Sequence, residues 1–336
     1  MNPLLSIIIL TRNSMNVIQR LVAALERQDF SYPVEYIFMD NASTDGTREY
    51  LESLKLAPRR VEHVPIGEFS HSGTRMRAAS LATGTMLAFF TDDIIPQGAG
   101  FLSALTLPVR EGRAPAAYGV WQIDPGTSDP VDAWLHNGWY RDVIQLVEPV
   151  SRFCWDFFTP ELRRRLCNFD NCASCIRRDL LLQVRFPDVP YGEDMLFAKR
   201  LVLGGHRIAL AAEARFIHWH KVSFTYMMKR MCIDQYLSIP EFEIYYVRRK
   251  LGVIKAVTVR AIHRTWIAFI KVKMPFLRKF YWSAYNFKIL CADFIGKYIG
   301  VLNEDSARGF SPINRRLLRL QKKIVKGIES RSILRY

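Results

Sequence analysis

The chain has 336 residues, of which 49% are hydrophobic and 24% charged, a composition that supports a sizeable folded core and excludes a disordered chain. Six cysteines at uneven spacings fit a reducing compartment better than a disulfide framework, and the lone Cys172–Cys175 motif has no second pair to complete a zinc site. The sequence shows no secretory signal and no run of about eighteen apolar residues that would predict a membrane-spanning helix.

The net charge of +15 is concentrated in the last third of the chain. Residues 1–220 carry 23 Lys and Arg against 25 Asp and Glu, whereas residues 221–336 carry 24 against 7. This shift in charge predicts two regions with different partners. We place the boundary at residue 222, between a first domain over 1–222 and a basic helical region over 223–336.

The first hundred residues alternate between short apolar runs and helical patterns. Residues 4–10, 34–39 and 86–90 have the composition of buried strands, while residues 15–28 and 51–54 show helical spacing of their apolar side chains. Strands that alternate with helices across short links predict a parallel sheet with right-handed crossovers. The expected fold class is therefore α/β.

Polar side chains follow the first two predicted strands. Thr11 and Asn13 come after the first, and Asp40 and Ser43 after the second. Open α/β sheets bind ligands at the carboxyl ends of their strands, so these side chains can contact a base and a ribose. Ser43 suits a helix cap equally well. No GxGxxG motif follows the first strand, which disfavours a nicotinamide or flavin dinucleotide.

The strand over 86–90 leads into two adjacent carboxylates, Asp92 and Asp93, and Pro96 then ends the extended segment. Carboxylate oxygens suit Mg²⁺ or Mn²⁺, and such an ion keeps open positions for a substrate diphosphate. A solvated turn after a strand is the alternative interpretation. The motifs that accompany the pair favour the metal site.

Taken together, these motifs resemble the nucleotide-sugar-binding half of the family 2 inverting glycosyltransferases, whose fold is called GT-A. The resemblance rests on Ser6–Asn13, on Asp40–Gly46 and on the Thr91–Asp93 strand end. The segment Gly67–Met76 is similar to a motif of the rhamnosyltransferase branch, in which Asn usually stands at the position of Met76. The resemblance implies a nucleotide-sugar half over about residues 1–100 and an acceptor half over about 101–222.

The resemblance also implies roles for single residues. Asp93 matches the metal-binding Asp of the family, and Asp92 is expected to contact the nucleotide sugar. The guanidinium of Arg75 is expected to reach the nucleotide or its diphosphate. His218 and His220 stand at i and i+2 on an extended segment and point the same way. In the family a His at this place completes the metal site, and the sequence leaves open which of the two does so.

A second acidic pair, Glu193 and Asp194, opens a helical pattern after the loop Phe186–Gly192. Acids at a helix N-terminus are stabilised by the helix dipole whatever their function. The segment Pro190–Leu201 resembles the Glu-Asp motif of the family, in which the Asp is the general base. The resemblance therefore implies that Asp194 deprotonates the acceptor hydroxyl and that Glu193 supports it.

Beyond Ser223 the pattern is helical, over residues 253–273, 276–302 and 315–326, with Lys and Arg between bulky apolar and aromatic side chains. Such helices suit the headgroup layer of an anionic membrane, in which they lie without spanning it. A protein partner, self-association into a homo-oligomer, and nucleic acid are the alternatives. No nucleic-acid-binding motif is visible, so we favour the membrane.

The resemblance thus implies a metal-dependent inverting glycosyltransferase with a Rossmann-like, mostly parallel sheet flanked by helices and a basic amphipathic C-terminal region. It implies transfer of L-rhamnose from dTDP-β-L-rhamnose to a lipid-linked cell-surface glycan by single displacement. We expect the protein to be cytoplasmic and peripheral on the inner face of the plasma membrane. A UDP- or GDP-hexose donor is one alternative, and a non-catalytic glycan-binding or scaffold role is another.

Overall fold

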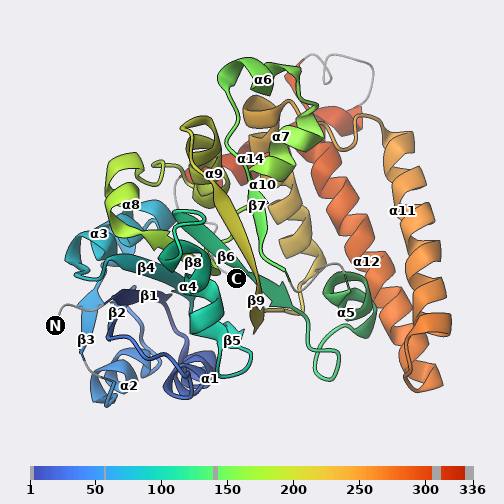
Figure 1. The fold of residues 1–336 in the computed structure, drawn as a ribbon. Helices are drawn as coiled ribbons and strands as arrows, with labels where there is room; N and C mark the ends of the chain where they lie inside the picture. The colour runs from blue at the N-terminus through green and yellow to red at the C-terminus, as the bar shows by residue number, and fades with distance from the viewer. Residues whose placement is uncertain (1–3, 57, 139–142, 305–311, 330–336) are drawn as a thin grey trace. The chain divides into compact units, whose positions relative to one another are not determined.

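The computed structural model describes residues 4–56, 58–138, 143–304 and 312–329, and the chain divides into two compact units (Figure 1). The division assigns to unit 1 Met1–Gln122, Tyr140–Phe158 and Leu162–His218, and to unit 2 Ile123–Trp139, Thr159–Glu161 and Trp219–Tyr336.

Unit 1 is built on a mixed sheet of nine strands within the described residues. The order along the sheet is β3-β2-β1-β4-β8-β6-β9-β5, and β7 pairs with β9. The strands β1 to β4 are parallel, whereas β8 runs antiparallel to both β4 and β6. Their bounds are β1 Leu5–Thr11, β2 Val34–Asp40, β3 Arg59–His63, β4 Met86–Thr91, β5 Ile95–Pro96, β6 Ala116–Gln122, β7 Gln145–Val147, β8 Ala173–Arg177 and β9 Ile208–Ile217.

Helices cover both faces of this sheet, which is why β1 is buried along its whole length. In β4, Ala88 and Phe90 point into a core shared with α1 and α4, while Phe89 packs against Phe186 on the opposite face. Phe186 in turn contacts Phe197 of α9. The helices of this part are α1 Met15–Glu26, α2 Thr47–Ser53, α3 His71–Leu81, α4 Phe101–Arg110, α6 Arg152–Phe157, α7 Pro160–Leu166, α8 Arg178–Val184 and α9 Glu193–Leu203.

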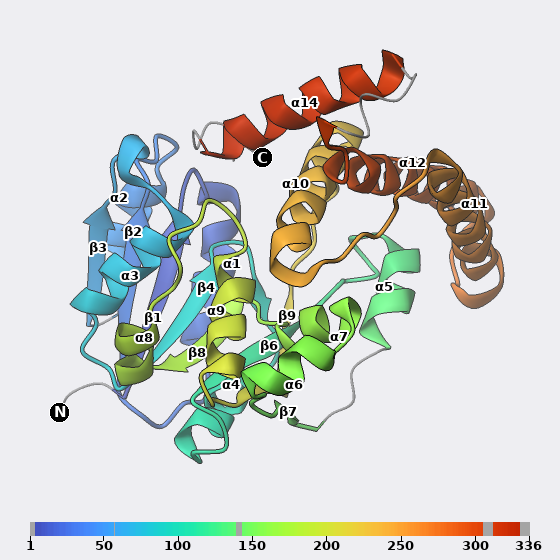
Figure 2. The same cartoon turned by 90° about the horizontal axis from the view of Figure 1, so that it is seen from above.

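Unit 2 is helical throughout its described secondary structure. In the second view α11 and α12 run beside one another, and α10 packs on α12 (Figure 2). Gly296 and Gly300 make the α10 contact possible, because a Cβ at Gly300 would lie 2.6 Å from the carbonyl oxygen of Cys232. The helices are α5 Pro130–Asn137, α10 Phe224–Phe242, α11 Lys250–Trp266 with a π-helical continuation Ile267–Lys271, α12 Phe276–Gly300 and α14 Pro312–Glu329.

Helix α5 belongs to unit 2 because side chains tie it to α11 and α12. Val131 packs against Ile267 in a small apolar cluster, and the Asn286 amide donates to the carboxylate of Asp129 at 2.9 Å. Residues 123–139, which the sequence analysis placed in the acceptor half, therefore group with the C-terminal helices. Within the described parts of the chain, every helix is too short or too polar to cross a membrane.

Candidate active site

The loops after β1 and β2 are held together by their own polar side chains. Asp40 is fully buried, and its carboxylate accepts hydrogen bonds from the hydroxyls of Thr11, at 3.3 Å, and Ser43, at 2.5 Å. The Ser43 hydroxyl oxygen accepts the backbone N–H of Asn13, whose side-chain carbonyl accepts the N–H of Thr44. The structure thus brings together Thr11, Asn13, Asp40 and Ser43, with the carboxylate of Asp40 engaged inside the protein.

Asp45 closes the same loop from the other side. Its carboxylate accepts the N–H of Met15 at 3.0 Å, at the start of α1, and the N–H of Thr47 at 3.1 Å, at the start of α2. Burial raises the pKa of Asp45, but hydrogen bonds from Thr47 and Met15 outweigh burial and hold the pKa below its usual value. The residue is therefore an anion that stabilises two helix N-termini.

Asp92 and Asp93 extend from the end of β4, as predicted, but their surroundings differ. Asp92 accepts a hydrogen bond from the Ser14 hydroxyl, and burial followed by the charge of Asp93 raises its pKa to about 6. Asp93 faces His218, with 3.5 Å between the carboxylate Oδ1 and the imidazole Nε2, and both side chains are about a quarter exposed. Strand β9 ends one residue before His218, so two strand ends create this pair.

The Asp93–His218 pair fits a divalent cation. A carboxylate oxygen and an imidazole nitrogen that face one another, both partly open to solvent, form the donor set that such ions use in proteins. His220 follows two residues later and is exposed, and it belongs to the last segment of unit 2, which begins at Trp219. Within unit 1, His218 is the histidine that faces Asp93, and the expectation that His218 or His220 completes a metal site stays a prediction.

Glu193 and Asp194 open helix α9, and the left-handed conformation of Gly192, with φ of 76°, turns the chain into it. The two acids face different neighbours because successive helix positions are rotated by about 100°. Glu193 is buried and pairs with Arg75 of α3 at 2.5 Å. Arg75, which the sequence analysis expected to contact the nucleotide or its diphosphate, is 4% exposed. Its guanidinium is already paired with Glu193.

Asp194 is half-buried, and its carboxylate accepts the N–H of Met195 at 2.7 Å. Burial, followed by the negative charges of Glu193 and Asp170, raises its pKa to about 7. The Met195 hydrogen bond and the charge of Arg75 oppose this rise. A carboxyl that titrates near neutrality has the acidity expected of a general base.

Cys172 lies in unit 1 directly before β8. Burial and the charge of Asp170, with smaller effects of Asp93 and Asp194, raise the pKa of its thiol well above the usual value. The backbone carbonyl of Cys172 accepts the N–H of Thr91, the residue that precedes Asp92 and Asp93. Asp93 and Asp194 thus both influence the pKa of the partly buried Cys172.

Four residues of this site were not identified as functional from sequence. They are Ser14 beside Asp92, His71 beside Arg75, and Asp170 with Cys172 near Asp194. Burial and the charge of Arg75 lower the pKa of His71 to about 4. His71 lies inside the Gly67–Met76 segment that carries the family resemblance, which is the signal that could have drawn attention to it.

The geometry of this site agrees with comparisons to known proteins. Residues 6–166, a little under half of the chain, match the family model described as Glycosyl transferase family 2. The O-antigen chain rhamnosyltransferase WbaN of Salmonella anatum is 25% identical over 193 residues, which cover 56% of this chain and 57% of that protein. The match thus spans little more than half the length of this curated relative.

Solved glycosyltransferase structures share the fold. Residues 1–349 of TarS from S. aureus superpose with a TM-score of 0.50 at 17% identity, covering 93% of this chain and 92% of that chain. The mannosyltransferase PcManGT from Pyrobaculum calidifontis gives a TM-score of 0.50 at 16% identity, covering 99% and 88%. The predicted fold class, an α/β sheet of the GT-A type flanked by helices, is confirmed.

Proposed function

We propose that this protein is a metal-dependent inverting glycosyltransferase that transfers L-rhamnose from dTDP-β-L-rhamnose to a lipid-linked glycan by single displacement. The observation that carries the proposal is the facing pair of Asp93 and His218 at two strand ends of unit 1, the same unit in which the pKa of Asp194 is raised to about 7. An inverting transfer requires both a base for the acceptor and positive charge for the leaving diphosphate.

Asp194 acts as the base. Its carboxylate takes the proton of the acceptor hydroxyl while the acceptor oxygen forms a bond to the anomeric carbon. The bond from that carbon to the diphosphate oxygen breaks on the opposite face, and the electron pair leaves with the nucleoside diphosphate. Glu193 is bound to Arg75 at 2.5 Å, so it supports Asp194 by position and charge and is not itself a proton acceptor.

Asp93, His218 and His220 would hold the divalent cation, Mg²⁺ or Mn²⁺, which would neutralise the leaving diphosphate. Support comes from the facing donors of Asp93 and His218, and from His220 being only two residues further along the chain. The structure of PcManGT was obtained in complex with GDP-Man and Mn²⁺, a nucleotide sugar and a divalent ion together.

The polar strand ends would contact the nucleotide. Thr11, Asn13, Asp40 and Ser43 hold one loop in a fixed shape, which favours a preformed surface for a base and ribose. Asp92 lies beside the proposed cation, and Arg75 would act mainly through Glu193. A dTDP-rhamnose donor is favoured over a UDP- or GDP-hexose by the Gly67–Met76 segment and by the named activity of the Salmonella anatum relative.

A panel of nucleotide sugars tests this proposal. Transfer or donor hydrolysis is measured with dTDP-rhamnose, UDP-hexoses and GDP-mannose, in Mg²⁺, in Mn²⁺ and after chelation. We expect turnover of dTDP-rhamnose that is lost on chelation and restored by the ion. Preferred turnover of another donor would show that the transferred sugar is not rhamnose and would leave the proposed mechanism unchanged. Full turnover in the chelator would refute the metal assignment, and a native protein inactive with every donor and a lipid-diphosphate acceptor would favour a glycan-binding role.

We also propose that unit 2 attaches the enzyme to the cytoplasmic face of the inner membrane, where its acceptor is held. Exposed apolar side chains recur along α11 and α12 and lie among basic residues, which is the composition of helices in a headgroup layer. This apolar face comprises Leu251, Ile254, Ile262, Ile270, Phe276, Leu277 and Phe280, each more than half exposed.

A further inference from the structure

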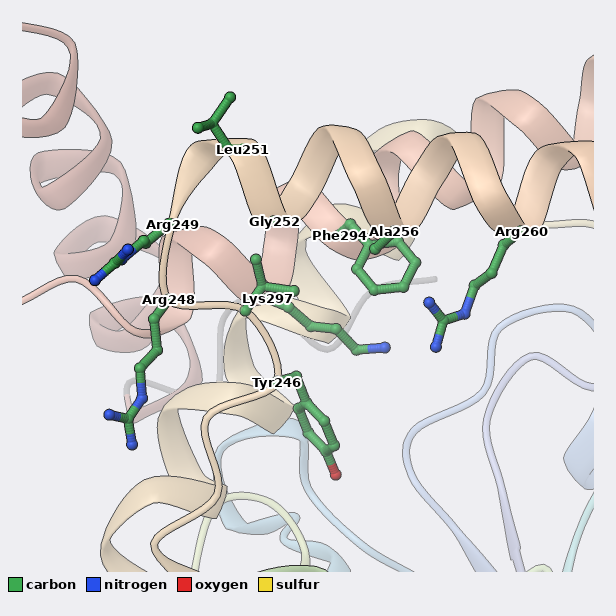
Figure 3. A pocket seen from close by; sticks show the side chains of 10 residues that line it. Tyr246, Arg248, Arg249, Leu251, Gly252, Ala256, Arg260, Phe294 and Lys297 are labelled. Carbon is green, nitrogen blue, oxygen red and sulfur yellow. The ribbon is translucent and has the colours of Figure 1, made fainter.

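A cavity of about 490 Å³ opens in unit 2 between the segment before α11, α11 itself and α12 (Figure 3). Four of its lining residues are cations and none is an acid. Its volume falls within the range of small-molecule sites, about 300–1,000 Å³. The residues important to its chemistry are Tyr246, Arg248, Arg249, Arg260, Phe294 and Lys297.

Two of the cations converge. In Figure 3 the side chains of Lys297 and Arg260 extend toward one another, whereas Arg248 and Arg249 lie at the other end of the cavity. The Arg260 guanidinium carbon lies 4.7 Å from the ring centroid of buried Phe294, and the Lys297 ammonium lies 5.0 Å from the same centroid. One ring therefore holds two positive groups at one end of the cavity.

The positive charge of the cavity is only partly balanced. Lys297 pairs with Asp293 at 2.7 Å. Over the part of the chain that the structure describes, Arg248, Arg249 and Arg260 form no ion pair with a carboxylate. Like charges held close together repel, and an anion placed between them relieves the repulsion. Arginine's planar fork matches phosphate oxygens in particular.

We propose that this cavity binds a phosphomonoester or diphosphate group, with the aromatic walls of Tyr246 and Phe294 against the organic part that carries it. Leu251, which is 77% exposed, belongs both to the cavity lining and to the apolar face of α11 and α12. A lipid headgroup can therefore enter the cavity while its chains lie along that face. A free phosphate compound offers the same chemistry. The inference extends the membrane part of the proposed function and does not depend on sugar transfer.

The test compares two single-charge variants of the full chain. Arg260→Gln removes a cation of the cavity, and Lys255→Gln removes an exposed cation of the same helix that does not line it. Binding of inorganic pyrophosphate is measured by calorimetry in a metal chelator. Vesicle sedimentation is measured with phosphatidic acid and with phosphatidylserine at matched surface charge. Thermal melting confirms that both variants fold.

We expect Arg260→Gln to weaken pyrophosphate binding, phosphatidic acid binding, or both about tenfold relative to Lys255→Gln. An effect confined to phosphatidic acid identifies a lipid headgroup as the source, and an effect confined to pyrophosphate identifies a free ligand. Equal effects of the two variants in both arms, or no pyrophosphate binding together with equal vesicle binding, would overturn the cavity site. Failure of all vesicle binding with intact pyrophosphate binding would refute the membrane proposal alone.

Discussion

The two units hold their charges in opposite environments. In unit 1 the acids of the candidate site are buried or half-buried, and each acts on its neighbours, as the raised pKa values of Asp92 and Asp194 show. In unit 2 the cations of α11 are largely exposed to solvent. A charge in a low-dielectric site interacts strongly with few partners, whereas an exposed charge is screened and contributes additively. Single substitutions should therefore have large, specific effects in unit 1 and small effects at the exposed cations of unit 2 outside the proposed anion cavity.

The largest effect is expected for Asp194→Asn, which keeps the size of the side chain and removes the proposed base. We expect kcat to fall about 10³-fold, within the range for loss of a general base. Asp179→Asn is the matched control, since Asp179 is an exposed acid of α8 paired only with Arg177 and should leave activity unchanged. Steady-state assays decide the matter, and comparable activity of both variants would remove Asp194 from the mechanism.

The next largest effect is on folding. Arg75→Gln leaves Glu193 buried without its partner, and we expect the free energy of unfolding to fall by about 3 kcal/mol. Arg77→Gln, two positions along α3, breaks an exposed pair with Glu62 and should cost less than about 1 kcal/mol. Urea unfolding measures both. Equal losses would mean that the Arg75–Glu193 pair is not buried as described.

The pH dependence of kcat/KM tests how the charges of Glu193 and Arg75 set the pKa of Asp194. Asp194 is a neutral acid below its raised pKa and a carboxylate above it, so kcat/KM should rise about tenfold per pH unit up to about pH 7 and then level off. Glu193→Gln removes a charge that raises this pKa and should move the rise to lower pH. Arg75→Gln removes a charge that lowers it and should move the rise to higher pH. If kcat/KM rises at the same pH in both variants as in the wild type, the charges of Glu193 and Arg75 do not act on the pKa of Asp194.

The smallest effect is expected in unit 2. Lys273→Gln removes one exposed cation near the apolar face and should weaken binding to anionic vesicles by about 1 kcal/mol, and less at high salt. Lys55→Gln removes an exposed cation of unit 1 and should have no effect. Vesicle sedimentation across a salt series compares them. A large, salt-independent loss in Lys273→Gln would show that unit 2 does not bind through additive surface charge.

The sequence was most informative where a local pattern determines position. Apolar runs followed by acids predicted that Asp92 and Asp93 end a strand and that Glu193 and Asp194 open a helix, because each needs only neighbouring residues. The pairing of Arg75 with Glu193, 118 residues apart, depends on how α3 and α9 pack. The place of Cys172 depends on the antiparallel alignment of β8 with β4. The spacing of residues along the sequence does not determine which distant segments pack or pair with one another.

Residues 123–139 illustrate the same limit at the level of domains. The change in charge near residue 220 and the family resemblance placed them in the acceptor half. The contacts that attach α5 to unit 2 come from Ile267 and Asn286, which are far away along the chain. The dense aromatic residues of the C-terminal helices predicted an interfacial surface, but the shared ring of Phe294 under two cations became visible only in three dimensions.

The placement of Asp45 has a consequence for how a nucleotide sugar can be held. Helix N-termini after parallel strands are the usual seats of phosphate groups in α/β proteins. Here the carboxylate of Asp45 already accepts hydrogen bonds from the first residues of α1 and α2, at the position where a phosphate would otherwise bind. A diphosphate approaching these strand ends meets negative charge in the place where many nucleotide-binding folds offer a positive one. Positive charge for a diphosphate must then come from another source, and the divalent cation proposed at Asp93 and His218 would supply it.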